Sequence, residues 1–233
     1  MNFELSAEHL ALRDRARAAA AAAQDRSGDI DRAGAVPEDL ARLARLLGET
    51  DSLGQVIVVE ELATASPALA IAAAGASGEA LGLTGLRGAT RLENEPRSHL
   101  VLAAAALGLG RGALADALAE LRRPMPVSGV DVEKPHWVVA DVATELDAAR
   151  LLTYKAARTL NEADIAVARL MATAAAGRAV DTALRVCGAE ALKEGTRLER
   201  LSRDVRALAV VLGTEEHQRA IAAEGLLPHQ PTT

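Results

Sequence analysis

The chain has 233 residues, half of them hydrophobic, so it is long enough to bury a sizeable core in one large domain or two small ones. The apolar residues are mostly Ala, Leu and Val, and the only aromatic residues are Phe3, Trp137 and Tyr154, which favours closely packed helices over sheets. With a formal net charge of −6 and few aromatic side chains for base stacking, the composition argues against a nucleic-acid partner. The single cysteine, Cys187, excludes an internal disulfide and fits a reducing compartment.

Neither export nor membrane insertion is indicated by the apolar segments. The stretch MNFELSAEHLALRDRARA becomes charged within a few residues and has no signal-like apolar core. The longest apolar runs, such as residues 100–109, are too short to span a bilayer. We therefore expect an all-α cytoplasmic protein without membrane contact.

Capping residues predict two helices early in the chain. Ser6 is a suitable N-cap, and the Ala-rich run behind it predicts a helix to about residue 23. The polar stretch QDRSGDIDRAG then breaks the pattern. Pro37 occupies a first helical position, and a stripe of leucines behind it predicts a helix that Gly48 ends.

The next segment, GQVIVVEELATASP, is ambiguous because its β-branched residues at 56–59 could form a buried strand. The acidic pair and the alanines that follow continue smoothly as a helix, so a helix is predicted. Ser66 and Pro67 restart a helix as N-cap and first residue. The glycine-rich region 75–88 is expected to be broken or loosely helical.

A polar connector, RLENEPRSH, is the best candidate for a boundary in the chain. It separates an N-terminal helical domain at 1–90 from a C-terminal helix bundle at 98–233, with residues 91–97 as the connector. The bundle is expected to contain these helices: 98–122, 135–159, 162–186, 198–212 and 214–224.

Four stretches, taken in order, resemble the acyl-CoA dehydrogenase family, whose members depend on FAD. They are FELSAEHLALRD, VVEELATASPALA, ADVATELDAARLLTYKAA and CGAEALKEGTRLERLSRDVRALAVVLGTEEHQ. The resemblance implies an all-α fold in which an N-terminal helical subdomain packs on a C-terminal four-helix-type bundle. The family normally inserts a β-barrel-like domain between the two, and only the connector 91–97 stands in that place. The resemblance therefore implies a short member that lacks the middle β domain.

The family's chemistry needs a carboxylate that takes the α-proton of the acyl thioester while the β-hydride passes to the flavin. Aligning VVLGTEEHQ on the family's ending places Leu212 where that glutamate usually stands, and the alternative base position of some relatives falls near Ser98. Neither residue is a carboxylate. Glu215 is the remaining catalytic candidate, but it lies beyond the break at Gly213. Its other interpretation is a first-turn acid behind an N-cap at Thr214.

The same resemblance implies FAD contacts at five positions that match the family's pattern: Arg123, Gly188, Gly213, Thr214 and Glu216. Other contact positions differ, since two glutamines of the family fall on Glu133 and Arg185, and a neighbouring glycine has become Ala189. Acidic side chains beside a pyrophosphate repel it. The resemblance therefore implies an FAD site that is weakened, lost or shared with a partner subunit.

The other polar clusters have simpler interpretations. Glu60 and Glu61, like Glu145 and Asp147, are predicted to lie on solvated helix faces rather than to form an acid–base pair. The five histidines show no metal-binding spacing with one another or with cysteine, so no metal site is predicted. Cys187 is predicted to be a buried small hydrophobic residue rather than a nucleophile.

Two further segments have structural interpretations. The dense charges of RLERLSRDVR, residues 197–206, match a segment that is largely structural in the family, so we expect ion pairs there to orient the last helices. The small residues at 72–85 could line an acyl channel or permit close helix packing, and the sequence allows both.

Three functional hypotheses follow from the resemblance. The first is a non-catalytic partner subunit, in a hetero-oligomer with a full-length acyl-CoA dehydrogenase that supplies the base and most of the flavin contacts. The second is an active FAD-dependent acyl-CoA dehydrogenase with a relocated base, assembled as a homo-oligomer. The third is a scaffold that performs non-redox work on an acyl thioester.

Overall fold

The computed structural model describes residues 4–40, 50–74, 94–123 and 133–227. Within these ranges the protein is all-α and contains no β-strand, which confirms the predicted fold class. The predicted helix at 37–48 falls mostly outside these ranges, and the region 75–88 falls outside them entirely. The described helices, in chain order, are α1 (Ala7–Gln24), α2 (Ser27–Ala33), α4 (Ser52–Ala63), α5 (Pro67–Ala73), α6 (Pro96–Leu121), α7 (Glu133–Thr159), α8 (Glu162–Cys187), the 3₁₀ helix η1 (Ala189–Leu192), α9 (Arg197–Val210) and α10 (Glu215–Glu224).

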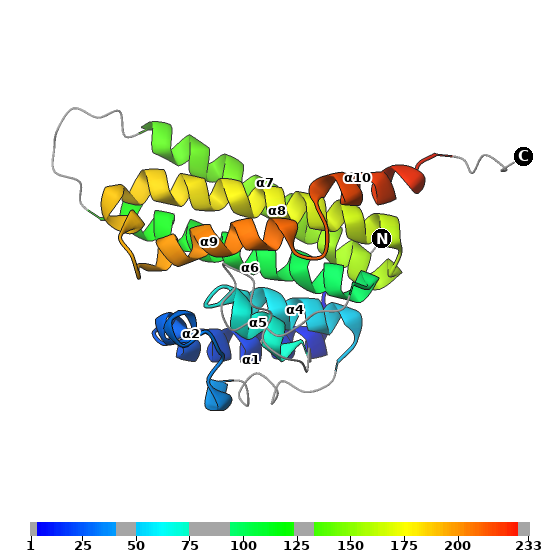
Figure 1. The fold of residues 1–233 in the computed structure, drawn as a ribbon, viewed down its shortest axis with the longest axis horizontal. Helices are drawn as coiled ribbons and strands as arrows, with labels where there is room; N and C mark the ends of the chain where they lie inside the picture. Colours follow the sequence, from blue (N-terminus) through cyan, green and yellow to red (C-terminus); the bar gives the residue numbers. More distant parts are fainter. Residues whose placement is uncertain (1–3, 41–49, 75–93, 124–132, 228–233) are drawn as a thin grey trace, which may run out of the picture.

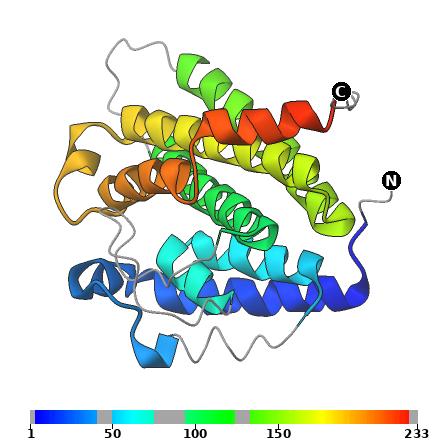
Figure 2. The same cartoon turned by 45° about the vertical axis from the view of Figure 1, so that its right-hand side comes forward.

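The helices form two layers (Figure 1 and Figure 2). The smaller layer contains α1, α2, α4 and α5, and the bundle of α6 to α10 lies against it. Helix α6 lies between them, because it contacts α4 and α5 on one side and α7, α8 and α9 on the other. This is the predicted packing of an N-terminal helical subdomain on a C-terminal bundle. The exact division at 91–97 stays a prediction, since residues 91–93 lie outside the described ranges and α6 already begins at Pro96.

Helix starts follow the predicted caps. The Ser6 side chain accepts a hydrogen bond from the backbone N–H of His9 at the start of α1, at 3.2 Å. Ser66 caps α5 by accepting from Leu69 N, and the Asn161 side chain caps α8. These caps supply acceptors for backbone N–H groups that have no partner inside the helix.

The ambiguous segment forms helix α4, as predicted. All its residues from 56 to 63 are buried, including the acidic pair. A helix buried on every side has no polar face, so its sequence lacks the period of an amphipathic helix. This explains why the segment could also be interpreted as a buried strand.

Glycines let α6 approach both neighbouring layers. A Cβ atom built on Gly108 would lie 2.1 Å from the carbonyl oxygen of Glu60 on α4, and one on Gly110 would lie 2.8 Å from a methyl group of Leu146 on α7. Both distances are far below van der Waals contact. The backbone of α6 can therefore lie close to α4 of the smaller layer and close to α7 of the bundle.

Helix α6 also corrects one expectation from the sequence. Although the run 100–109 is short, the whole helix is long and apolar enough to cross a membrane by length and composition, alone among the described helices. Its most apolar window is 78% buried inside the protein, as expected for the core helix of a bundle.

The charged segment 197–206 forms ion pairs, as predicted, and some of them reach the N-terminal layer. Arg203 donates hydrogen bonds to both carboxylate oxygens of Asp31 on α2, at 2.8 and 3.1 Å, and also to Glu199. Arg200 donates to Ser27 Oγ at 3.0 Å. The Glu199 and Asp31 carboxylates raise the pKa of the Arg203 guanidinium.

Candidate functional site

The junction between α9 and α10 contains the position where the sequence predicts that a base is missing. Helix α9 ends at Val210, two residues earlier than predicted, because Leu212 takes a left-handed φ of 58° and Gly213 a φ of 119°. The left-handed conformation costs a non-glycine residue about 1–2 kcal/mol. Surrounding contacts must therefore hold Leu212 in place.

Arg169 on α8 provides those contacts. Its Nη2 donates to the carbonyl oxygens of Val211 and Gly213, which flank Leu212, and its Nη1 donates to Nδ1 of His99 on α6. The Arg169 side chain is buried, and it makes no ion pair with any carboxylate in the described part of the chain. Burial lowers its pKa to about 10, so it stays charged at neutral pH.

The tautomer of His99 follows from this contact. A guanidinium can only donate, so Nδ1 of His99 must accept and the ring proton must lie on Nε2. That Nε2 donates to the side-chain oxygen of Asn94 at 2.9 Å. Burial, followed by the nearby charges of Arg169 and His217, lowers the pKa of His99 to about 4. His99 is therefore neutral near pH 7, and Arg169 remains a buried positive charge.

A cavity of about 180 Å³ opens beside this junction, between the N-terminal ends of α6 and α8 and the side of α10. Gln218 on α10 is 2% exposed, and its Nε2 has no hydrogen-bond acceptor among the described residues. The residues that line the cavity are Asn94, Glu95, Pro96, His99, Glu162, Ile165, Ala166, His217, Gln218 and Ile221.

None of the predicted base positions carries a carboxylate poised at this junction. Leu212 is partly buried against the core, and Ser98 is buried at the start of α6. Glu215 forms an ion pair with Arg219 one turn later on α10, at 2.7 Å, with its side chain 45% exposed. Glu215 therefore occupies the position of a first-turn acid, and its role as a base stays a prediction.

Thr214 stands at the N-cap position of α10, but its side chain does not cap the helix. Instead, the Thr214 side chain and the helix backbone lower the pKa of the Glu216 carboxyl group. The helix start is thus stabilised by its acids rather than by a threonine cap, which corrects the expected role of Thr214.

The five predicted cofactor contacts fall into two groups at opposite ends of α6. Gly213, Thr214 and Glu216 lie at the junction, near His99, whereas Arg123 follows the other end of α6. Twenty-four residues of helical rise separate these ends, or about 36 Å. Gly188 belongs with the Arg123 group, since the sulfur of the adjacent cysteine lies 3.9 Å from the Asp116 carbonyl oxygen on α6.

The described side chains at these positions do not converge on a common site for FAD. Arg123 is 74% exposed and pairs with Glu120 at 2.8 Å, one turn earlier on the same helix. Gly188 has a φ of 75° and no atom within 4 Å of a Cβ built on it. The described residues at these five positions therefore do not enclose FAD by themselves.

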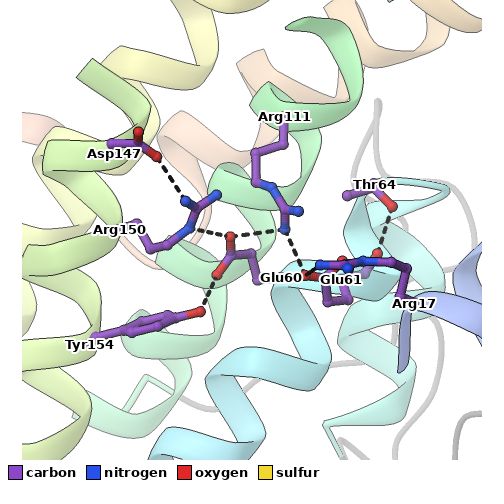
Figure 3. A network of polar contacts seen from close by, with 8 residues as sticks. All are labelled: Arg17, Glu60, Glu61, Thr64, Arg111, Asp147, Arg150 and Tyr154. Atoms are coloured by element: carbon purple, nitrogen blue, oxygen red, sulfur yellow. Dashed lines mark hydrogen bonds and ion pairs between the residues drawn. The ribbon is translucent and has the colours of Figure 1, made fainter. Parts of the chain in front are cut away.

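A buried polar network that the sequence did not predict joins the two layers (Figure 3). Glu60, 1% exposed, accepts hydrogen bonds from Arg150 Nε at 2.7 Å, the Tyr154 hydroxyl at 2.9 Å and Arg111 Nη1 at 3.0 Å. Glu61, 4% exposed, accepts from Arg111 and from Arg17 on α1, each at 3.1 Å.

This arrangement overturns the prediction that Glu60 and Glu61 lie on a solvated face. Helix α4 is buried all round, so its two carboxylates must be paired to remain charged. Burial and then the Glu60 charge raise the pKa of Tyr154, which keeps the phenol protonated as a donor. The bonds to the Glu60 and Glu61 carboxylates described above link α4 to α1, α6 and α7, so the network holds the two layers together.

The other acids and the cysteine that the sequence singled out show no sign of a reaction centre in the described ranges. Asp147 is exposed, as predicted, and Glu145 is half-buried beside Arg178. No group of three or more His, Cys, Asp or Glu residues in the described ranges could hold a metal ion. Cys187 is half-buried, and burial raises the pKa of its thiol, which disfavours a reactive thiolate.

Sequence reasoning missed the roles of Arg169 and His99. Arg169 stands within the apolar stretch IAVARLMATAA, and an arginine there could have been noticed as a buried cation. His99 has no sequence neighbour that indicates its partner, since Arg169 lies 70 residues away along the chain.

Comparison with known proteins adds the family to this geometry. The profile of the acyl-CoA dehydrogenase C-terminal domain matches residues 85–227, more than half of the chain. The 3-(aryl)acrylate reductase of Clostridium sporogenes is 31% identical over 133 residues, and the cyclohex-1-ene-1-carbonyl-CoA dehydrogenase of Geobacter metallireducens is 29% identical over 160. These matches cover 54% and 63% of this chain but 35% and 41% of the relatives, so the chain spans well under half of their length.

Solved structures show the same fold over nearly the whole chain. The butyryl-CoA dehydrogenase of Megasphaera elsdenii has a TM-score of 0.81 at 16% identity, covering 98% of this chain and 100% of that one. The ChsE4–ChsE5 complex of Mycobacterium tuberculosis has a TM-score of 0.76 at 15% identity, covering 99% and 100%. At these identities the similarity establishes the fold alone.

Proposed function

This chain belongs to the acyl-CoA dehydrogenase family, and from that membership we propose that it is a non-catalytic partner subunit of a flavin-dependent acyl-CoA dehydrogenase complex in the cytoplasm. The observation that carries the proposal is Leu212. It stands where the family places its base, in a backbone held on both sides by Arg169. Leucine cannot take up a proton, so in this alignment the position carries no base.

The distribution of the predicted cofactor contacts supports a shared site. The groups around Arg123 and Thr214 lie too far apart in one chain to surround one flavin, but each could face a cofactor held mainly by another subunit. Relatives with names that place them in complexes are consistent with this idea, among them the ChsE4–ChsE5 pair and the caffeyl-CoA reductase–Etf complex subunit CarC of Acetobacterium woodii. The partner would supply the base, the β domain and most flavin contacts.

The experiment is to purify the protein alone and after co-expression with an acyl-CoA dehydrogenase encoded beside it, and to record visible spectra and acyl-CoA-dependent dye reduction. We expect the protein alone to be colourless and inactive. The co-expressed proteins should purify together as an active yellow complex.

An active enzyme with a relocated base predicts a different result. In that case the protein alone would carry stoichiometric flavin, and dye reduction would be lost in Glu215→Gln but kept in Glu224→Gln, the matched change at the other end of α10. This outcome would refute the partner-subunit proposal. A colourless protein that purifies with no partner would instead support the non-redox scaffold.

A further inference from the structure

Three polar side chains in the N-terminal layer form a hydrogen-bonded relay that the proposed partner role does not use. The Ser6 hydroxyl oxygen lies 2.9 Å from Nδ1 of His9, and Nε2 of His9 lies 3.0 Å from a carboxylate oxygen of Asp51. Ser6 and His9 stand at the start of α1, whereas Asp51 caps the start of α4. The relay therefore brings a hydroxyl, an imidazole and a carboxylate together from segments 42 residues apart along the chain.

The partners of His9 determine which of its ring nitrogens carries the proton. An ionised carboxylate can only accept, so Nε2 of His9 donates to Asp51, and Nδ1 accepts from the Ser6 hydroxyl. The backbone N–H of Gly54 donates to the same Asp51 oxygen at 2.7 Å, which holds the carboxylate in place. The His9 side chain is only 17% exposed. A hydroxyl beside a base that a third group orients is the arrangement of an activated nucleophile.

The start of α1 favours negative charge on the Ser6 oxygen. The backbone N–H of His9 donates to this oxygen at 3.2 Å, and the positive end of the helix dipole lies at the same place. Both effects stabilise an oxygen whose proton passes to Nδ1. The two ring nitrogens are used in the reverse order from the usual Ser-His-Asp template, but either nitrogen of a neutral imidazole can act as the base while the other carries the proton.

A cavity of about 430 Å³ opens beside the relay, where the starts of α1 and α4 meet the end of α7. This volume lies within the range of small-molecule sites. Leu53 and Ala157 in its wall provide apolar surface for a short acyl chain. Arg158 adds a guanidinium that can stabilise an oxyanion, and its Nη2 is held by the Glu4 carbonyl oxygen at 3.1 Å.

We propose that this cavity is a hydrolytic site for esters of short-chain carboxylic acids, with Ser6 as nucleophile, His9 as general base and acid, and Asp51 as the residue that positions His9. The Ser6 oxygen bonds to the carbonyl carbon of the ester while its proton passes to Nδ1 of His9. The bond from that carbon to the leaving alcohol oxygen then breaks, and the alcohol takes up the proton. Water, which reaches the exposed Ser6 side chain, attacks the acyl group in the same way; this step releases the carboxylic acid and restores the hydroxyl.

The test is hydrolysis of 4-nitrophenyl butyrate by the purified full chain alone, followed by the release of 4-nitrophenolate. We expect saturable hydrolysis above the rate in buffer. A fluorophosphonate probe, which loses fluoride to an activated serine hydroxyl, should label Ser6 in peptide mass spectrometry. The site shares no residue with the α9–α10 junction and needs neither flavin nor a second subunit, so the result is independent of the partner-subunit proposal.

Three variants each remove one group of the relay. Ser6→Asn and Asp51→Asn replace each helix cap by another residue that caps well, so both helices should still form. Ser6→Asn should abolish hydrolysis and labelling, His9→Gln should lower kcat about 100-fold or more, and Asp51→Asn should lower kcat about tenfold or more with KM unchanged. The matched control His136→Gln removes an exposed histidine from the start of α7 and should leave the rate unchanged.

Circular dichroism of each variant distinguishes a lost reaction from a lost fold. The proposal is overturned by the absence of hydrolysis above the buffer rate, by the same rate in folded Ser6→Asn as in the wild type, or by a probe label on a residue other than Ser6.

Discussion

Replacing Glu60 by glutamine tests whether the buried polar network holds the two layers together. The substitution keeps the size and one oxygen of the side chain but removes its charge. Three donors converge on Glu60, namely Arg111, Arg150 and Tyr154. The new amide group would turn its own N–H donors toward at least one of them, and the two arginines would lose a buried counter-charge.

The magnitude follows from the burial of the partners. Removing one member of a fully buried ion pair costs about 3–5 kcal/mol. Arg111 and Arg150 are 24% and 28% exposed, so water screens part of the loss. We expect Glu60→Gln to lower the free energy of unfolding by about 3 kcal/mol. The control Glu145→Gln breaks a partly exposed pair with Arg178 and should cost less than about 1 kcal/mol.

The assay is urea unfolding followed by far-UV circular dichroism, with the free energy taken from linear extrapolation. Tyr154→Phe supplies a second arm, because it deletes a single hydrogen bond to a carboxylate and should cost about 1.5–3 kcal/mol in the wild type. In the Glu60→Gln background it should cost clearly less, since the charged acceptor is gone. The reasoning fails if Glu60→Gln matches Glu145→Gln, or if Tyr154→Phe costs the same in both backgrounds.

The remaining predictions use matched changes elsewhere in the chain. Gly108→Ala should destabilise the protein by several kcal/mol, because the new methyl group would meet a backbone oxygen of α4. Gly177→Ala in α8 has open space around it and should stabilise the protein by about 0.5–1 kcal/mol. Urea unfolding measures both changes. Burial raises the pKa of Asp204 to about 7, so the folded state binds its proton more tightly than the unfolded state does. The free energy of unfolding of the wild type should therefore fall as pH rises from about 4 to 7. In that window the stability of Asp204→Asn relative to the wild type should rise by up to about 1.4 kcal/mol per pH unit, and it should rise no further above pH 7. The pH dependence from His99 has the opposite sign, because its folded pKa of about 4 lies below the unfolded value of 6.5, so stability falls as pH drops between these values. Urea unfolding midpoints measured against pH should lose this slope in His99→Gln. An unchanged slope would contradict a buried neutral ring.

The helices could be predicted because their signals are local. Ser6, Ser66 and Asn161 lie within three residues of the N–H groups that they cap, so each helix start is written in a short window of sequence. The end of α9 could not be placed as well. Its last turn depends on the left-handed conformation of Leu212, which Arg169 imposes from another helix.

The polar network shows a different limit. Adjacent acids in a helix are usually solvated, and nothing beside Glu60 and Glu61 indicates otherwise. Their partners Arg111 and Tyr154 lie 51 and 94 residues from Glu60 along the chain. Only the packing of α4 against α6 and α7 brings these charges together, and this packing is a tertiary property. The predicted exposure of Glu60 and Glu61 was wrong because their partners lie far away along the chain.

The same distinction separates the side chain at position 212 from the backbone that carries it. A base requires one particular side chain at position 212, and a single substitution removes it. The backbone geometry there depends on Arg169, His99 and Gly213, which come from three separate parts of the chain. Losing Arg169 would release both the flanking carbonyl groups and the left-handed turn, and would disturb how α10 packs on α8. The backbone of the junction is therefore held by contacts that do not depend on the side chain at position 212, which is what the proposed non-catalytic role requires.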